Sequence, residues 1–222
     1  MIIYIGIGMA IAAYLIGSIN PSILLSTKLK GEDIRNTGSG NAGTTNMLRT
    51  HGKKLAAITL LCDILKGVLA VLIAMIIDVF IKKISTTNTI DSHILPALPY
   101  IAGFFAVLGH NFPIFFKFKG GKGVATALGV ILTLNYQVGL IAMSIALLIM
   151  IFTRYVSLGS CIGAGIFPLL LLAFSMGKGE INPLSIVFAC LIGLLVIARH
   201  HSNIKRLLNH EENKLSFKKK EK

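Results

Sequence analysis

The chain carries few charged residues. They make up 14% of the sequence, against about 25% in an ordinary soluble domain, while 54% of the residues are hydrophobic. This shortage excludes a sizeable soluble domain and predicts an all-α integral membrane protein. The net charge is +13, but nucleic-acid binding is not the expected reason. The basic residues stand between apolar segments and in a C-terminal tail, where they suit membrane orientation and contacts with anionic lipids or phosphorylated molecules.

Several catalytic and metal-binding signatures are also missing. The three cysteines all fall within apolar runs and form no CxxC pair, so neither a disulfide nor a zinc site is expected. The sequence has no GxSxG nucleophile elbow and no HExxH motif. No histidine is followed at the fifth position by aspartate, as in common acyltransferases. We expect no cofactor and no metal, although His200, His201 and His210 leave a metal site as a minor alternative.

Five apolar segments are long enough to cross a bilayer, which takes about 20 residues. They are residues 2–25, 55–81, 94–116, 157–176 and 183–198. The first lacks a basic start and a cleavage site, so we interpret it as a retained span and not as a signal peptide.

Residues 124–152 are ambiguous. The polar run Asn135-Tyr136-Gln137 interrupts them, so they form either one long span or two short ones. At ~1.5 Å per residue the part before this run covers only about 17 Å, too little to cross unaided.

The distribution of basic residues predicts seven spans, or a re-entrant pair equivalent to two of them. With seven spans, nearly all lysines and arginines lie on one side, and only Lys82, Lys83 and Lys178 lie on the other. Six spans would divide the charges almost evenly. Because cytoplasmic loops are enriched in lysine and arginine, we expect the N-terminus outside and the C-terminus in the cytoplasm.

This topology defines the expected organisation of the chain. Residues 1–198 form a membrane domain with cytoplasmic loops at 28–54 and 117–123. Residues 199–222 form a basic cytoplasmic tail, whose end at 218–222 is expected to lie on anionic headgroups.

Three polar segments rich in glycine and basic residues interrupt the apolar sequence on the predicted cytoplasmic side. We call residues 38–49, 120–126 and 199–206 the first, second and third islands. Each combines backbone, hydroxyl or amide donors with a cation, which is the chemistry of a phosphate site.

The first island contains the formal pattern GxGxxG, but no βαβ unit can surround it between two spans, so a dinucleotide site is not expected. Its glycines let backbone amides approach an anion, and Arg49 can bind phosphate through two hydrogen bonds. A flexible loop that only follows the positive-inside rule is the alternative. The candidate binding residues are Gly38, Ser39, Gly40, Asn41, Thr45, Asn46 and Arg49.

The second island begins with Gly120-Gly121-Lys122-Gly123 and leads into an apolar segment. We expect it at a helix N-terminus, where anions bind readily. It is not a P-loop, because glycine follows the lysine; a glycine hinge with a snorkelling lysine is the alternative.

The third island places His200 and Asn203 about one helical turn apart, between Arg199 and Arg206. A plain basic helix at the membrane surface is the alternative.

Three further features lie outside the islands. Asp63 and Lys66, three residues apart inside a predicted span, are expected to form an ion pair or to line a polar cavity. Ser157 either caps a helix or donates a hydrogen bond to a substrate. His110 is interpreted as a packed or interfacial histidine.

Taken in order, these segments resemble the bacterial acyl-phosphate:glycerol-3-phosphate acyltransferase family. The resemblance runs along almost the whole chain and is carried by residues 17–19, 28–35, 38–49, 63–67, 109–126 and 199–208. It implies a seven-span enzyme of the bacterial cell membrane with its active site facing the cytoplasm.

The resemblance also implies the reaction. Such enzymes transfer a fatty acyl group from acyl phosphate to the sn-1 hydroxyl of glycerol 3-phosphate, which gives lysophosphatidic acid and opens phospholipid synthesis. No covalent acyl-enzyme and no acyl carrier protein are expected, and the acyl chain is expected to arrive laterally from membrane lipid. An anion transporter and a membrane scaffold are the alternatives, although no repeated halves support transport.

Matching motifs assign roles to individual residues. The residues implied to be catalytic are Ser39, Arg49, His200 and Asn203. Those implied to bind substrate phosphates are Gly38, Gly40, Asn41, Thr45, Asn46, Gly120, Gly121, Lys122, Gly123 and Ser157. Either the departing phosphate or His200 is expected to take the proton of the acceptor hydroxyl.

Three positions depart from the family pattern. Thr44 stands in place of alanine, and Asn20-Pro21 replaces a pair that begins with proline. His210 takes the place of a glycine before Glu212, which leaves the local turn and the role of Glu212 open.

Overall fold

A computed structural model describes residues 2–84 and 97–215 of the chain, and every regular element in these ranges is helical. In order they are α1 (Ile2–Ser18), α2 (Pro21–Lys30), the 3-10 turn η1 (Ile34–Asn36), α3 (Thr44–His51), α4 (Lys53–Ile84), α5 (Leu98–Asn111), the 3-10 turn η3 (Ile114–Phe116), α6 (Val124–Leu134), α7 (Tyr136–Thr153), α8 (Val156–Lys178), α9 (Pro183–Ala198) and α10 (His201–Leu208). The expected all-α fold is therefore confirmed. The start of the predicted span at 94–96 and the tail end at 218–222 lie outside the described residues.

The protein crosses the membrane several times. Five segments are long and apolar enough to span a bilayer, and a sixth exists if α9 and α10, which meet at a bend of 59°, count as one. The five are Ile3–Lys30, Lys53–Lys83, Leu98–Phe116, Tyr136–Thr153 and Val156–Lys178. Helix α6 has 11 residues and is too short to cross alone.

Two asparagines divide apolar runs into separate helices. The predicted span 2–25 contains a break that the sequence analysis did not anticipate, because Pro21 starts α2 and the Oδ1 of Asn20 accepts from Ile23 N at 3.3 Å. The Oδ1 of Asn135 accepts in the same way from Val138 N at 3.1 Å. The ambiguous stretch 124–152 is thus two helices, α6 and α7.

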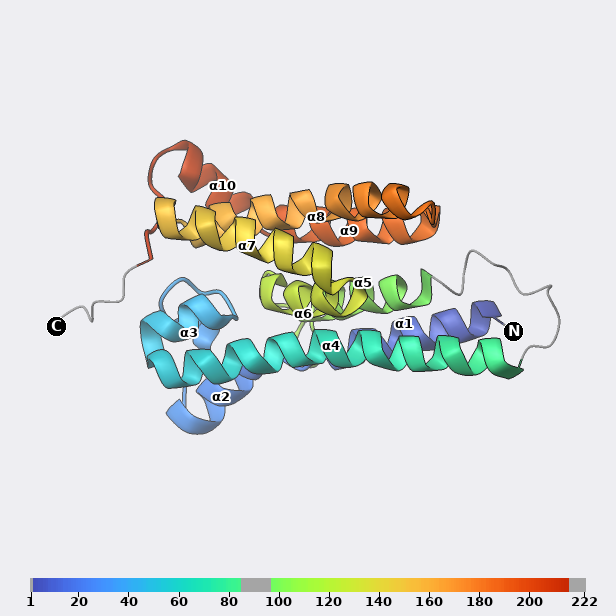
Figure 1. The fold of residues 1–222 in the computed structure, drawn as a ribbon. Coiled ribbons are helices and arrows are strands. Elements are labelled where there is room, and N and C mark those ends of the chain that lie inside the picture. Colours follow the sequence, from blue (N-terminus) through green and yellow to red (C-terminus); the bar gives the residue numbers. More distant parts are fainter. Residues whose placement is uncertain (1, 85–96, 216–222) are drawn as a thin grey trace.

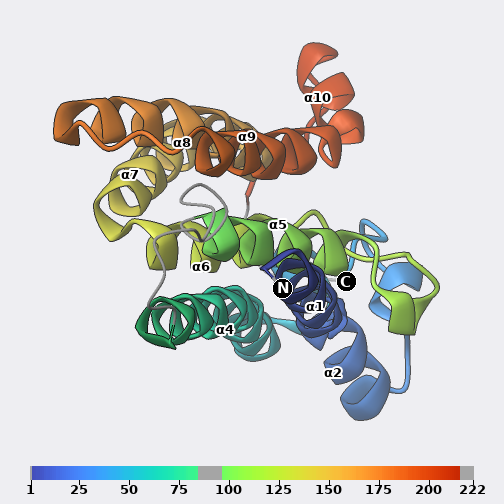
Figure 2. The same ribbon diagram turned by 90° about the vertical axis from the view of Figure 1, so that its right-hand side faces the viewer.

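The helices pack in layers. Figure 2 shows α8 and α9 on one side, α5 and α6 in the middle, and α1 and α4 on the other side. Glycines bring neighbouring layers close together: a Cβ on Gly129 of α6 would overlap the backbone oxygen of Ile64 in α4, and one on Gly17 of α1 would overlap that of Ala106 in α5. Small residues allow such approach in membranes, where packing and not water exclusion drives helix association.

The intramembrane ion pair is confirmed. The Nζ of Lys66 lies 2.8 Å from Asp63 Oδ1 and also donates to the backbone oxygen of Ile19 at 2.8 Å, in the break between α1 and α2. The Nδ1 of His110 lies 3.2 Å from the same carboxylate oxygen. All three side chains are buried, so His110 is a packed residue, and the network joins α4, α5 and the α1–α2 break.

The polar islands gather at one end of the bundle. In Figure 1, α2 and α3 lie at the end of the bundle opposite the N-terminus, and α10 lies at the same end on the other side of the bundle. The expected loop 28–54 is partly helical, since it contains η1 and α3.

Candidate phosphate-binding site

The first island is a loop held in shape by one asparagine. The Oδ1 of Asn46 accepts from Ser39 N at 2.9 Å, and its Nδ2 donates to the backbone oxygens of Ile34 and Thr37 at 3.0 Å each. Gly38 has a φ of 59°, and a Cβ there would overlap the Asn46 side chain. Asn46 was expected to bind substrate, but both hydrogens of its side-chain amide are donated to backbone oxygens of the loop.

Other first-island groups remain available for a ligand. Ser39, Gly40 and Arg49 are exposed, and Asn41 and Thr45 are half-buried. Among the described residues, neither the Ser39 hydroxyl nor the Arg49 guanidinium makes a hydrogen bond or an ion pair. A serine donor and an arginine cation are therefore free on the same loop and the helix that follows it.

The second island is wedged between the first island and α5. Gly121 N donates to His110 O at 3.2 Å, and Gly120 N donates to Asn111 O at 3.2 Å. A Cβ on Gly121 would overlap both the His110 ring and the backbone oxygen of Ala42 in the first island. Only glycine fits at this contact between the two islands. Gly123 then precedes α6 as its N-cap, as expected.

The third island lies at the bend between α9 and α10. His200 is buried, and its Nδ1 lies 2.7 Å from Val196 O. A carbonyl only accepts, so Nδ1 carries a hydrogen. Burial lowers the pKa of His200, which lies beyond the end of α9, to about 4. The ring is therefore neutral near pH 7, with Nε2 as an acceptor.

The second and third islands meet directly. The Nζ of Lys122 donates to Asn203 Oδ1, and the Nε and Nη2 of Arg199 donate to Gly121 O at 3.2 and 3.1 Å. With the contact of Gly121 against Ala42, all three islands are neighbours, although the sequence separates them by up to about 160 positions.

Glu212 holds the side chains of the third island in place, a role that could not be assigned from the sequence. Its Oε1 accepts from Ser157 Oγ at 2.9 Å and from Asn203 Nδ2 at 2.7 Å, and its Oε2 accepts from Arg206 Nε at 2.8 Å. His210 supplies the turn that brings this carboxylate back, with a φ of 59° in the left-handed region that glycine prefers.

The suggestion that Ser157 caps a helix is wrong. Helix α8 has Tyr155 at its N-cap and no side-chain cap. The Ser157 hydroxyl binds Glu212 instead, 55 positions away in the sequence. No local pattern could have revealed this partner.

The electrostatics of the site suit an anion. Burial lowers the pKa of Lys122 to about 8, with further lowering by Arg206 and Arg49 and an opposing effect of Glu212. Burial alone would raise the pKa of Glu212, but hydrogen bonds from Asn203, Arg206 and Ser157 hold it below its ordinary value. The site thus keeps the Glu212 carboxylate, already bound to three neighbouring side chains, beside several cations.

Comparison with known proteins shows the family of the chain. The family model for glycerol-3-phosphate acyltransferase matches residues 7–210. The chain is 40% identical over 210 residues to a glycerol-3-phosphate acyltransferase of Clostridioides difficile (strain 630), covering 95% of both chains. It is 44% identical over 209 residues to that of Thermoanaerobacter pseudethanolicus (strain ATCC 33223 / 39E), covering 94% of this chain and 95% of the relative.

Solved structures show the same fold. The crystal structure of PlsY (YgiH), an integral membrane glycerol 3-phosphate acyltransferase, in its glycerol 3-phosphate form has a TM-score of 0.77 at 39% identity, covering 95% of this chain and 96% of that one. Its lysophosphatidic acid form has a TM-score of 0.75, covering 96% of each chain. The chain therefore belongs to the glycerol-3-phosphate acyltransferase family of integral membrane acyltransferases.

Proposed function

We propose that this acyltransferase moves a fatty acyl group from acyl phosphate to the sn-1 hydroxyl of glycerol 3-phosphate, giving lysophosphatidic acid and phosphate. The observation that carries the proposal is the junction of the islands, where Lys122 meets Asn203 near Arg49, whose guanidinium has no partner in the described part of the chain. Two phosphate-bearing substrates need such a concentration of cations and donors. The relatives' names, and the two ligand forms of the related crystal structure, supply the same acceptor and product.

The mechanism we propose is direct transfer. The acceptor oxygen bonds to the carbonyl carbon of the mixed anhydride, the bond from that carbon to the phosphate oxygen breaks, and inorganic phosphate leaves. Arg49 and Lys122 neutralise the phosphates, and Ser39 donates a hydrogen bond. Alignment of the hydroxyl and stabilisation of charge supply the acceleration, so no covalent acyl-enzyme is required.

Asn203 receives a positioning role in this mechanism. Its Oδ1 accepts from Lys122 and its Nδ2 donates to Glu212, so its amide holds the lysine in place. Gly38, Gly40, Gly120, Gly121 and Gly123 shape the two loops, while the half-buried Asn41 and Thr45 remain candidates for direct substrate contact.

The departing phosphate takes the proton of the acceptor hydroxyl. The rival base, His200, has a pKa near 4, too low for efficient proton removal near neutral pH. Replacing His200 with glutamine should leave substantial activity with an unchanged pH profile; a loss of the acidic limb together with nearly all turnover would make His200 the base.

We also propose seven crossings, with the N-terminus outside and the islands in the cytoplasm. The charge pattern supports this: α4 and α8 run to the end of the bundle opposite the islands, and their last turns carry Lys82, Lys83 and Lys178. Because α6 has only 11 residues, the seventh crossing would need α6 together with the polar segments on either side of it. Labelling of Lys54→Cys and Lys83→Cys in intact cells should modify the second alone with a membrane-impermeant reagent.

The acyl donor is proposed to enter from the bilayer, without acyl carrier protein. Purified protein in detergent should release phosphate from palmitoyl phosphate when glycerol 3-phosphate is present. Release that is independent of the acceptor, or strict dependence on the carrier protein, would contradict the proposed reaction.

A further inference from the structure

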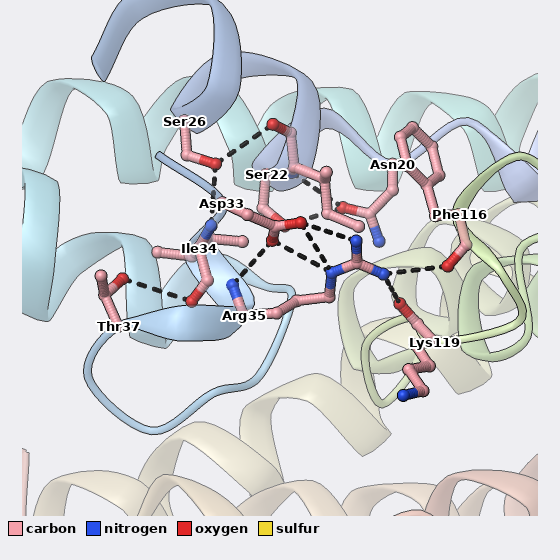
Figure 3. Close-up of polar contacts among 10 residues, drawn as sticks. Asn20, Ser22, Ser26, Asp33, Ile34, Arg35, Thr37, Phe116 and Lys119 are labelled. Carbon is pink, nitrogen blue, oxygen red and sulfur yellow. Dashed lines mark hydrogen bonds and ion pairs between the residues drawn. The ribbon is translucent and has the colours of Figure 1, made fainter. Parts of the chain in front are cut away.

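Arg35 ties the first island to the chain segment that leads into the second island (Figure 3). Its Nη1 donates to Phe116 O at 2.9 Å and to Lys119 O at 3.1 Å. Its Nε lies 3.0 Å from each oxygen of Asp33, and its Nη2 lies 2.6 Å from Oδ2. One guanidinium therefore joins η1 to a loop more than 80 positions away.

The two carbonyls that Arg35 binds flank a strained pair. Lys117 and Phe118 have φ values of 58° and 57°, a region that costs free energy for residues with a Cβ. Both side chains are exposed, so burial does not hold them there. Such conformations persist only where surrounding contacts determine them, and they cluster at functional sites.

Both ends of this connection reach the proposed pocket. On one side, Lys119 is followed directly by Gly120, Gly121 and Lys122. On the other side, η1 leads into the loop that presents Ser39, and its Ile34 carbonyl is held by Asn46. The Arg35 contacts therefore add a second link between the first and second islands, beside the direct contact of Gly121 with Ala42.

We infer that Arg35, oriented by Asp33, is a positioning residue for acyl transfer, which fixes the Lys117–Phe118 bend and so sets Lys122 against the first island. The inference rests on the proposed function of this pocket. The hydrogen bonds of Arg35 go to Asp33 and to the loop carbonyls, so it acts on Lys122 through the loop backbone.

These contacts require an arginine, because they depend on the fixed, planar arrangement of the guanidinium N–H groups. Five N–H donors in one plane serve a carboxylate and two carbonyls at once, whereas a lysine ammonium cannot reproduce that geometry. The hydrogen bond from Arg35 also holds the pKa of Asp33 below its ordinary value, so the pair stays ionised in mildly acidic buffer.

The test is Arg35→Lys in the purified full-length protein. We expect kcat/KM for glycerol 3-phosphate to fall between about tenfold and 100-fold, as for a misplacement of about 1 Å, with an unchanged melting temperature. In the Asp33→Asn variant, Arg35 can still donate to both carbonyls, so kcat/KM should fall less than in Arg35→Lys. Lys119→Ala is the matched control: it removes a charge but keeps the backbone oxygen, so it should behave as wild type.

Calorimetric binding of glycerol 3-phosphate separates this inference from the proposed reaction, because binding needs no acyl donor. Weaker binding in Arg35→Lys but not in Lys119→Ala supports the positioning role. Wild-type kinetics and binding in Arg35→Lys, or a loss explained entirely by unfolded protein, would overturn it. A wild-type protein that binds glycerol 3-phosphate but releases no phosphate from palmitoyl phosphate would contradict only the proposed donor.

Discussion

Single side chains in the proposed pocket fall into two groups, according to whether their polar atoms already have partners. Glu212, Asn203 and Asn46 are fully engaged with neighbouring groups, so they hold the site in shape. The Ser39 hydroxyl and the Arg49 guanidinium have no partner among the described residues and are free to bind substrate. Residues of the first group should affect stability and activity together, and those of the second group should affect activity alone.

Glu212→Gln tests the first group. The neutral amide cannot accept from Ser157, Asn203 and Arg206 as a carboxylate does, and hydrogen bonds to charged groups contribute about 1.5–3 kcal/mol each. We expect a lower melting temperature and at least about a tenfold loss of activity. Glu211→Gln, one position earlier and exposed, is the control; equal behaviour of the two variants would contradict the role of Glu212.

The pH dependence of substrate capture tests Lys122. Its pKa of about 8 means that the ammonium loses its proton as the pH rises through about 8, so attraction for phosphate falls above that value. Because kcat/KM reports the free enzyme, kcat/KM for glycerol 3-phosphate should decline on this alkaline side. Lys122→Arg, which stays protonated, should shift the decline to higher pH; identical profiles for both proteins would exclude Lys122 as its cause.

At the scale of helices and loops, local signals predicted what is local. The bounds of α9 match the predicted span 183–198, since a capping asparagine and a proline mark its start. The same pair of a capping asparagine and a proline, Asn20-Pro21, marks the start of α2. The sequence analysis treats this pair only as a departure from the family pattern and therefore does not predict the break between α1 and α2. The cap suggested for Ser157 is wrong, and its actual partner, Glu212, comes from a distant segment. Arg35 lies in the run 28–35 that carries part of the family resemblance, but no motif gives it a role.

The close contact between α4 and α6 can be tested by substitution of a glycine. Gly129→Ala would push a methyl group into the backbone of α4 at Ile64, and overpacking of this kind costs about 1–3 kcal/mol. The melting temperature in detergent should drop clearly. Gly8→Ala in α1, where a Cβ would have open space, should be neutral or slightly stabilising. A tolerated Gly129→Ala would show that α4 and α6 are not packed as described.

For the whole molecule, the arrangement of charge was the most informative part of the sequence. Because basic residues and glycines are concentrated in three segments, their position at one end of the bundle could be predicted, and α3 and α10 do lie at the same end. The sequence could not predict which atoms meet. The contact of Lys122 with Asn203 and the wedge of Gly121 against Ala42 depend on the bend after α9 and on helix packing, neither of which leaves a local pattern.

The central claim is that the islands bind the phosphates of both substrates in one pocket, and a double-mutant cycle tests it most directly. The measurement is kcat/KM for glycerol 3-phosphate in wild type, Arg49→Ala, Lys122→Ala and the double variant. If both cations serve one pocket, their effects on kcat/KM should be coupled. The fold-loss of the double variant should then be smaller than the product of the two single fold-losses, by a factor that corresponds to a coupling free energy of about 0.5–3 kcal/mol. Strictly multiplicative losses would place Arg49 and Lys122 in independent sites and contradict the shared pocket.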